Sequence, residues 1–158
     1  MENMKKINDE LTVSGQVTAE QLYEVANEGF KSVMNLRSPD EKGFLTDEEQ
    51  QAKALGLHYV NIPVKVDTLT EEQTTKILKE IDELPKPALI HCGTTMRAGA
   101  MSLMNVATRQ EMTPEQAFEK AGEIGFDCSS NPKMKEFFAQ YVSKNAWNCS
   151  SSLIAQVS

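Results

Sequence analysis

Cysteine, histidine and tryptophan are all scarce in this chain. Its 158 residues include three cysteines, two histidines and one tryptophan. Three cysteines are too few for a disulfide scaffold, and they leave at least one thiol unpaired. No pair of cysteines has the spacing of metal ligands, so we expect neither a metal site nor a cofactor. This composition excludes the disulfide-rich and zinc-binding classes, and it favours a reducing, cytoplasmic compartment.

Long apolar runs and a basic surface are missing as well. No segment approaches the roughly 18 apolar residues of a membrane span, and residues 1–6 carry two lysines in place of an apolar signal region. The formal net charge is −7, whereas nucleic-acid binding normally needs a basic surface. We therefore expect neither a membrane nor a nucleic acid as a partner.

What remains is the composition of a soluble globular protein, with 40% hydrophobic and 25% charged residues. The length suits one domain with a hydrophobic core. We expect a single α/β domain over residues 1–144, followed by a polar, serine-rich tail over residues 145–158. The composition does not indicate an oligomeric state.

Short apolar segments alternate with helical patterns along the first two thirds of the chain. Strands are expected near residue 7 and at 11–13, 32–36, 58–62 and 88–90, after a polar lead-in over residues 1–6. Four capping boxes indicate where helices begin, and they start at Thr18, Thr46, Thr70 and Thr113. Further helices are expected after Arg97 and from Pro132. This alternation predicts a mostly parallel central sheet with helices on both faces.

One segment combines a buried strand, a tight loop and a helix, namely residues 87–99 (PALIHCGTTMRAG). Cys92 ends the strand, and Arg97 opens the helix. Active sites in parallel sheets lie at the carboxyl ends of strands. The first turn of a helix attracts anions, because its N–H groups are unpaired and the helix dipole is positive there. The segment therefore predicts a cradle for an oxyanion, with a sulfur nucleophile beneath it.

Each residue type in this loop has a chemical reason to be there. Helix N-termini and neighbouring cations favour the thiolate form of cysteine, which is the nucleophile. The planar guanidinium of Arg97 can bind two phosphoryl oxygens at once. His91 points to the other face of the strand, which suits an orienting residue better than a general base. The residues expected to bind the oxyanion are Gly93, Thr94, Thr95, Met96 and Arg97. The alternative interpretation is an ordinary buried cysteine followed by a solvated arginine, and the strand–loop–helix context favours the reactive loop.

Four segments carry a resemblance to a known family, and they are residues 14–16 (SGQ), 29–37 (GFKSVMNLR), 59–64 (YVNIPV) and 91–97 (HCGTTMR). Over about residues 5–142 the chain resembles the cysteine-dependent dual-specificity phosphatase superfamily. It is most similar to the small bacterial phosphatase-like family that also occurs fused to metallo-β-lactamase-like hydrolases. Typical superfamily members have five residues between cysteine and arginine, whereas this chain has four, as the bacterial family does. They also follow the arginine with serine or threonine, where this chain has Ala98.

The resemblance implies a phosphatase fold and a phosphorylated substrate, or an oxyanion such as phosphate or sulfate, as the partner. Cys92 is then the nucleophile that forms a cysteinyl phosphate, and Arg97 binds the phosphoryl oxygens. The general acid of these phosphatases lies on the loop after the strand at 58–62, where Asp67 is the candidate. Asp40 and Glu41 are the alternatives on a neighbouring loop.

Two other functions stay open at this point. A rhodanese-like sulfurtransferase would carry a persulfide on Cys92, and its loop also has four residues between the cysteine and a basic residue. A phosphate- or sulfate-binding protein without turnover is the third possibility.

Overall fold

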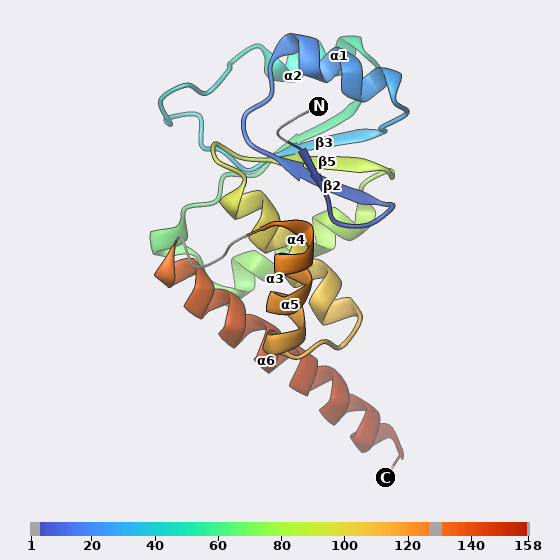
Figure 1. Ribbon diagram of the computed structural model, residues 1–158, viewed down its shortest axis with the longest axis vertical. Helices are drawn as coiled ribbons and strands as arrows, with labels where there is room; N and C mark the ends of the chain where they lie inside the picture. The colour runs from blue at the N-terminus through green and yellow to red at the C-terminus, as the bar shows by residue number, and fades with distance from the viewer. Residues whose placement is uncertain (1–3, 127–130, 158) are drawn as a thin grey trace.

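The computed structural model describes residues 4–126 and 131–157, with side chains described as far as residue 145. These described residues form a five-stranded sheet and six α-helices (Figure 1). The elements in chain order are β1 (Met4–Lys6), β2 (Leu11–Ser14), α1 (Ala19–Asn27), β3 (Ser32–Asn35), α2 (Glu48–Ala54), β4 (His58–Asn61), the 3₁₀ helix η1 (Val66–Thr68), α3 (Glu71–Glu83), β5 (Ala88–His91), α4 (Met96–Arg109), α5 (Pro114–Ile124) and α6 (Pro132–Val157).

The sheet has the strand order β1-β2-β5-β3-β4, so β5 lies at its centre. Strands β2, β5, β3 and β4 are parallel, and β1 pairs antiparallel with β2. The predicted mostly parallel sheet is confirmed. Ser14 and Asn35 both pair with His91. Because these three residues end their strands, the loops that follow leave the sheet at one edge.

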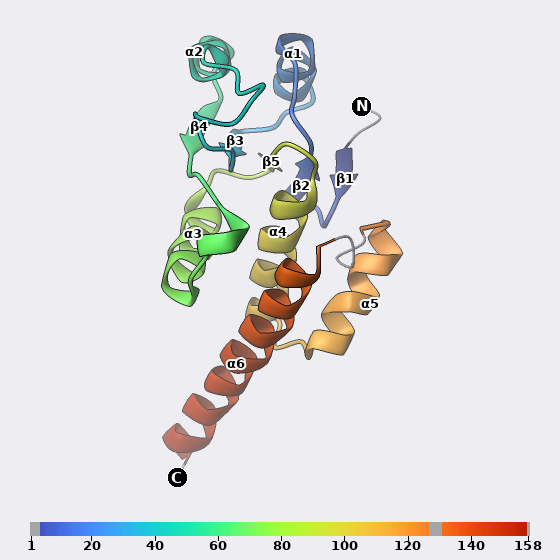
Figure 2. The same cartoon turned by 90° about the vertical axis from the view of Figure 1, so that its left-hand side faces the viewer.

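Helices cover both faces of the sheet, as predicted. Helices α1 and α2 lie over one face, and α3, α4, α5 and α6 lie on the other side (Figures 1 and 2). The larger part of the core lies on the second side and includes Met34, Leu78, Ile90, Met101 and Phe138. A smaller cluster packs under α1 and α2 and includes Leu22, Val25, Val33, Tyr59 and Leu89. The central strand is thus buried from both faces, and this fixes the position of the loop that follows it.

Three of the four predicted capping boxes are present, at Thr18, Thr70 and Thr113. The box predicted at Thr46 is wrong. Helix α2 has Asp47 as its N-cap residue, without a side-chain cap hydrogen bond. Glu49, the expected partner of Thr46 in this box, pairs with Lys53 over 3.3 Å. Glu48, inside the same segment, is fully buried and hydrogen-bonds to the side chains of His91 and Gln16.

Both ends of the chain depart from their predicted structure. Residues 4–6 form the edge strand β1 rather than a polar lead-in, since main-chain pairing with β2 needs no apolar pattern. Residue 7, expected in a strand, follows β1 and is buried. Helix α6 continues to Val157, so the segment expected as a polar tail is helical there. The domain limit at residue 144 stays a prediction.

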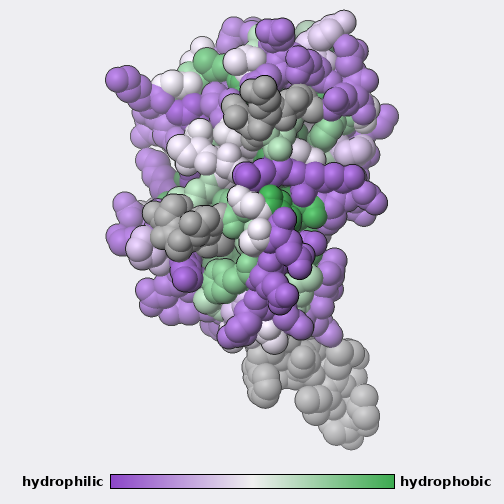
Figure 3. Space-filling model, in the orientation of Figure 1, coloured by the Kyte–Doolittle hydropathy of each residue, from purple (hydrophilic) through white to green (hydrophobic). Residues whose placement is uncertain are grey.

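The surface matches the expectation for a polar globular protein. Hydrophilic residues cover most of the face seen in Figure 3. Among the residues whose side chains are described, Tyr23 is the one large hydrophobic side chain that is exposed, at 57%. None of the described helices has the length and apolar character needed to cross a lipid bilayer.

Candidate active site

Cys92 follows the central strand β5 directly, and its side chain is fully buried. The backbone N–H of Cys92 donates to Ser14 O, at the end of β2, over 3.2 Å. The Sγ atom accepts a hydrogen bond of 3.5 Å from the N–H of Ala98, in the first turn of α4. That turn carries the positive end of the helix dipole, so the contact stabilises negative charge on the sulfur. The predicted juxtaposition of cysteine and helix N-terminus is present.

The backbone of the loop lies directly against two guanidinium groups. A Cβ atom built on Gly93 would lie 3.5 Å from Nη2 of Arg97 and 3.7 Å from Nε of Arg37. Thr95, the N-cap residue of α4, has φ 78° and ψ −27°, a left-handed conformation that is unfavourable for a threonine. Gly15, directly after β2, forms an antiparallel β-bridge with Thr94, and this bridge supports the loop.

Arg97 is fully engaged by groups of its own chain. Its Nη1 and Nη2 atoms donate to the two carboxylate oxygens of Glu41 over 2.8 and 2.9 Å. Nη1 also donates to the carbonyl oxygens of Val64 (3.0 Å) and Leu36 (3.4 Å). A bidentate arginine–carboxylate pair has the same fork geometry as an arginine–phosphate pair. The Glu41 carboxylate therefore occupies the guanidinium fork of Arg97.

Glu41 is held in its ionised form by this contact. The hydrogen bonds from Arg97 lower the pKa of Glu41 to about 2, against the opposing effect of burial. The backbone N–H of Ser38 and the guanidinium of Arg37 contribute to the same lowering. The hydrogen bonds that Arg97 donates to Glu41 raise the pKa of Arg97. Asp40, the residue before Glu41, is exposed and pairs with Lys65 over 3.3 Å.

A chain of hydrogen bonds joins the residue before the cysteine to the arginine. His91 Nε2 lies 2.6 Å from Oε2 of Glu48, and both side chains are fully buried. Gln16 Nε2 donates to Oε1 of Glu48 over 2.7 Å, and its Oε1 accepts from Nη1 of Arg37 over 2.7 Å. Nε of Arg37 donates to Oε1 of Glu41 over 3.2 Å. Glu41 in turn accepts from the guanidinium of Arg97. This series of hydrogen bonds therefore connects His91, directly before Cys92, with Arg97 at the end of the loop.

Asp67 lies on η1 and faces solvent. Its Oδ1 accepts from Nζ of Lys133, in the first turn of α6, over 3.0 Å, and 79% of the Asp67 side chain is exposed. Within the described part of the chain, Asp67 makes no hydrogen bond to Cys92 or Arg97. The structure thus brings together Cys92, His91 and the loop up to Arg97, while Asp67 pairs with α6.

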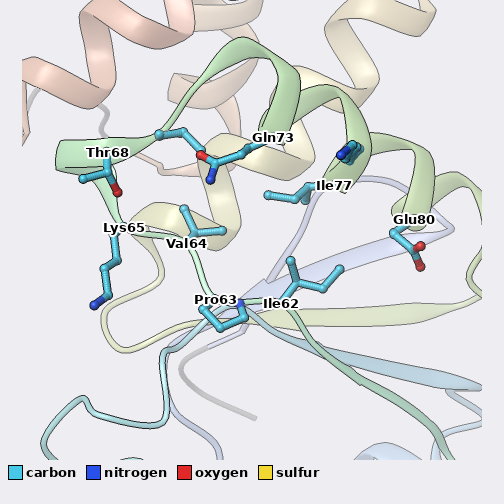
Figure 4. Close-up of a pocket in the computed structure, with 10 residues that line it drawn as sticks. Ile62, Pro63, Val64, Lys65, Thr68, Gln73, Ile77 and Glu80 are labelled. Atoms are coloured by element: carbon cyan, nitrogen blue, oxygen red, sulfur yellow. The ribbon is translucent and has the colours of Figure 1, made fainter.

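A pocket of about 430 Å³ opens beside the segment that follows β4 and includes Val64 (Figure 4). It lies between that segment and α3. Its apolar lining consists of Ile62, Pro63, Val64, Leu69 and Ile77, and its polar lining of Lys65, Thr68, Gln73, Lys76 and Glu80. Val64 belongs to both places, since it lines this pocket and its carbonyl oxygen accepts from Arg97. No group of three His, Cys, Asp or Glu side chains that could hold a metal ion occurs among the described residues.

Sequence reasoning gave no role to three residues of this site: Gln16, Arg37 and Glu48. Two of them lie in segments that carry the family resemblance, Gln16 in residues 14–16 and Arg37 in residues 29–37. The resemblance in those two segments therefore indicated that Gln16 and Arg37 belong to the surroundings of the site. Glu48 gave no such signal, because an acidic residue in a first helical turn is typical of a cap.

The architecture matches a known fold. The mostly parallel sheet, with a cysteine directly after its central strand and an arginine in the first turn of the next helix, has the fold of the dual-specificity-type phosphatases. A Shewanella putrefaciens protein described as a candidate phosphatase (DUF442) superposes with a TM-score of 0.76 at 20% identity, over 90% of this chain and 93% of that one. TpbA of Pseudomonas aeruginosa, solved with phosphotyrosine, gives a TM-score of 0.71 at 15% identity, over 87% and 82%.

The sequence gives the narrower assignment. Residues 3–118 match the family described as "Beta-lactamase hydrolase-like protein, phosphatase-like domain", and the chain belongs to this family. A beta-lactamase hydrolase-like protein of Agrobacterium fabrum is 28% identical over 148 residues, which cover 84% of this chain and 34% of that protein. The chain thus spans about a third of the length of that curated relative.

Proposed function

We propose that this chain is a phosphatase that hydrolyses a phosphomonoester through a cysteinyl phosphate on Cys92. One observation carries the proposal: Cys92 Sγ accepts from the first turn of α4, and the Arg97 fork ends the same loop. Proteins of the same fold support it, since TpbA was solved with phosphotyrosine and PTPMT1 with PI(5)P. A thiolate enzyme needs a reducing compartment, and we propose the cytoplasm.

The reaction has two steps. In the first, the thiolate of Cys92 attacks phosphorus, the bond from phosphorus to the ester oxygen breaks, and Asp67 donates a proton to the leaving oxygen. In the second, water attacks the cysteinyl phosphate, and the Asp67 carboxylate accepts a proton from that water. The phosphorus–sulfur bond then breaks, releasing inorganic phosphate and the thiolate. Arg97 binds the phosphoryl oxygens throughout.

Asp67 is the proposed acid in preference to Glu41. Asp67 lies on the loop after β4, where the resembled phosphatases carry their general acid, whereas Glu41 lies on a neighbouring loop and is bound to Arg97 in the substrate-free structure, with a pKa of about 2. Asp67 is exposed and pairs with one lysine, so a substrate on the loop can recruit it by a movement of η1. The proposed acid thus acts from the loop where the family resemblance places it.

The test is the hydrolysis of a small aryl phosphate between about pH 5 and pH 8. Cys92→Ser should abolish turnover. Asp67→Asn should lower kcat by about 10²–10⁴ and remove the alkaline limb of the pH profile. Asp9→Asn is the matched control and should leave kcat unchanged, because Asp9 is also an exposed aspartate paired with one lysine but lies in the turn before β2, at the other end of the strand from the Cys92 loop. Turnover that survives in Cys92→Ser would contradict the proposal.

Sulfur transfer is the second candidate, because four residues separate Cys92 from Arg97 and Ala98 offers no hydroxyl. A shorter loop makes a smaller cradle. Incubation with thiosulfate, followed by mass spectrometry of the peptide that contains Cys92, distinguishes the two functions. A persulfide on Cys92 together with no phosphate release would favour the sulfurtransferase.

A further inference from the structure

We propose that Glu48 is a positioning residue for the Cys92 loop, acting on His91 directly and on Arg97 through Gln16 and Arg37. The proposal deepens the proposed function and rests on it for the role of the loop. Glu48 makes no hydrogen bond to Cys92 or Arg97, and its bonds to His91 and Gln16 lead toward the two ends of the loop. Tyr59 on β4 also faces Glu48, since burial and the nearby carboxylate raise the pKa of Tyr59.

The burial of Glu48 needs an explanation. It opens the seven-residue helix α2, where an acidic side chain could have faced solvent like its neighbour Glu49. Instead its side chain is fully buried. Removing a carboxylate from water costs several kcal/mol unless charge pairing and hydrogen bonds compensate for it. The partners of Glu48 are therefore what keeps it inside, and both of them belong to the surroundings of the Cys92 loop.

The first partner fixes the strand end from which Cys92 projects. The Oε2 atom of Glu48 lies 2.6 Å from Nε2 of His91, the residue directly before the cysteine. One proton lies between Nε2 and Oε2, and the bond fixes the ring whichever of the two atoms carries that proton. The Nδ1 atom of His91 is buried without a hydrogen-bond partner. Glu48 is thus the group that sets the orientation of this ring.

The second partner reaches the other end of the loop. Gln16 donates its amide to Glu48 and offers its oxygen to Arg37, and its backbone N–H donates to Gly93 O over 3.4 Å. Arg37 then donates to Glu41, which holds the fork of Arg97. One carboxylate therefore constrains both ends of the loop, at the cysteine and at the arginine. A displacement of about 1 Å in such a loop can cost 10²-fold in rate.

The test uses Glu48→Gln, with Glu49→Gln as the matched control on the same helix. Glu48→Gln keeps the size of the side chain and replaces one carboxylate oxygen by an NH₂ group, so it can no longer offer an oxygen to both His91 and Gln16. We expect kcat for the aryl phosphate to fall by about 10-fold or more, and the rate of iodoacetamide reaction at Cys92, followed by peptide mass spectrometry, to change its dependence on pH. Glu49→Gln should alter neither quantity.

Gln16→Leu tests the second arm separately. It breaks the link to Arg37 but leaves the Glu48–His91 pair in place. We expect KM to rise and sulfate to protect Cys92 less well from iodoacetamide, because Gln16 no longer holds the guanidinium of Arg37 beside Gly93. The pH dependence of Cys92 alkylation should stay that of the wild type. Glu48→Asp, which keeps the charge on a shorter side chain, should recover part of the lost kcat, and it replaces Glu48→Gln if that variant does not fold.

The outcomes separate this inference from the proposed function. A lower melting temperature in Glu48→Gln, with kcat, KM and the alkylation profile unchanged, would show a structural role only and overturn the proposal. Alkylation and sulfate protection do not depend on turnover. If the wild type hydrolyses no phosphate ester and Glu48→Gln still shifts the alkylation profile, the positioning role stands and the phosphatase assignment fails.

Discussion

The contact between Glu41 and Arg97 makes a quantitative prediction about anion binding. An incoming oxyanion needs the same guanidinium fork, so it must displace the Glu41 carboxylate. The variant Glu41→Gln keeps an oxygen that can accept from Ser38 but removes the charge that competes for Arg97. Sulfate is the probe, because it remains a dianion over the whole pH range of the experiment. We expect Glu41→Gln to bind sulfate more tightly than the wild type.

The magnitude follows from the pKa of Glu41, which lies at about 2 compared with an ordinary value of 4.5. At about 1.4 kcal/mol for each pKa unit, the whole difference corresponds to about 3 kcal/mol. The Glu41 side chain is 26% exposed, and solvent screens such a pair, so we take about 1–2 kcal/mol as its contribution. This corresponds to about 5–30-fold tighter sulfate binding by the variant near pH 7.

The pH dependence of sulfate affinity provides a second test of the contact between Glu41 and Arg97. Sulfate displaces Glu41 from Arg97, so the pKa of Glu41 rises again in the complex and binding takes up a proton in acid. Wild-type affinity should therefore increase as the pH falls from about 5 toward 3, whereas the affinity of Glu41→Gln should be nearly flat. Isothermal titration calorimetry in buffers of different ionisation enthalpy measures the proton uptake directly.

The control is Asp40→Asn, which removes a neighbouring charge that pairs with Lys65 rather than with Arg97. It should change sulfate affinity by less than about 2-fold, as expected for an exposed pair. Equal or weaker sulfate binding by Glu41→Gln would refute the reasoning. It would mean that Glu41 holds Arg97 in place for the anion and does not compete with it.

Three further predictions concern stability. Because the folded-state pKa of Glu41 is depressed, its contribution is fully present above about pH 4.5 and is lost as the pH falls toward about 2; urea unfolding of Glu41→Gln should show a flatter acid limb than the wild type. Gly99→Ala should destabilise the fold by about 1–3 kcal/mol, because its Cβ would overlap the ring of Phe126. Gly122→Ala, with open space around it, should instead stabilise α5 by about 0.5–1 kcal/mol. Thr95→Gly should raise the melting temperature by relieving about 1 kcal/mol of backbone strain, and an unchanged or lower value would mean that the contacts of the threonine side chain outweigh the strain.

Much of the fold follows from local patterns. The alternation of strands and helices, three capping boxes and the loop from Cys92 to Arg97 are each encoded within a few neighbouring residues, and the structure contains all of them. A parallel sheet then requires the loop to lie at the carboxyl edge. This is why the sequence predicts where the site lies, although it does not predict what surrounds it.

The rest depends on contacts between distant segments. Glu48 reaches His91 across 43 positions, and Glu41 reaches Arg97 across 56. In the sequence, Glu48 is indistinguishable from a capping residue, and Glu41 from any loop carboxylate. The edge strand β1 escaped prediction for a similar reason, since its pairing with β2 is made by the backbone and leaves no hydrophobic pattern.

Val64 has a consequence for inhibition. Its carbonyl oxygen accepts from Arg97, while the same residue lines the pocket beside α3. A compound that fills this pocket and shifts the segment after β4 would remove a fixed contact of Arg97 without entering the place of the phosphoryl group. Its inhibition would be of mixed type, and saturating substrate would not relieve it. A mimic of phosphate, by contrast, would be displaced by substrate, so the two kinds of inhibitor could act together.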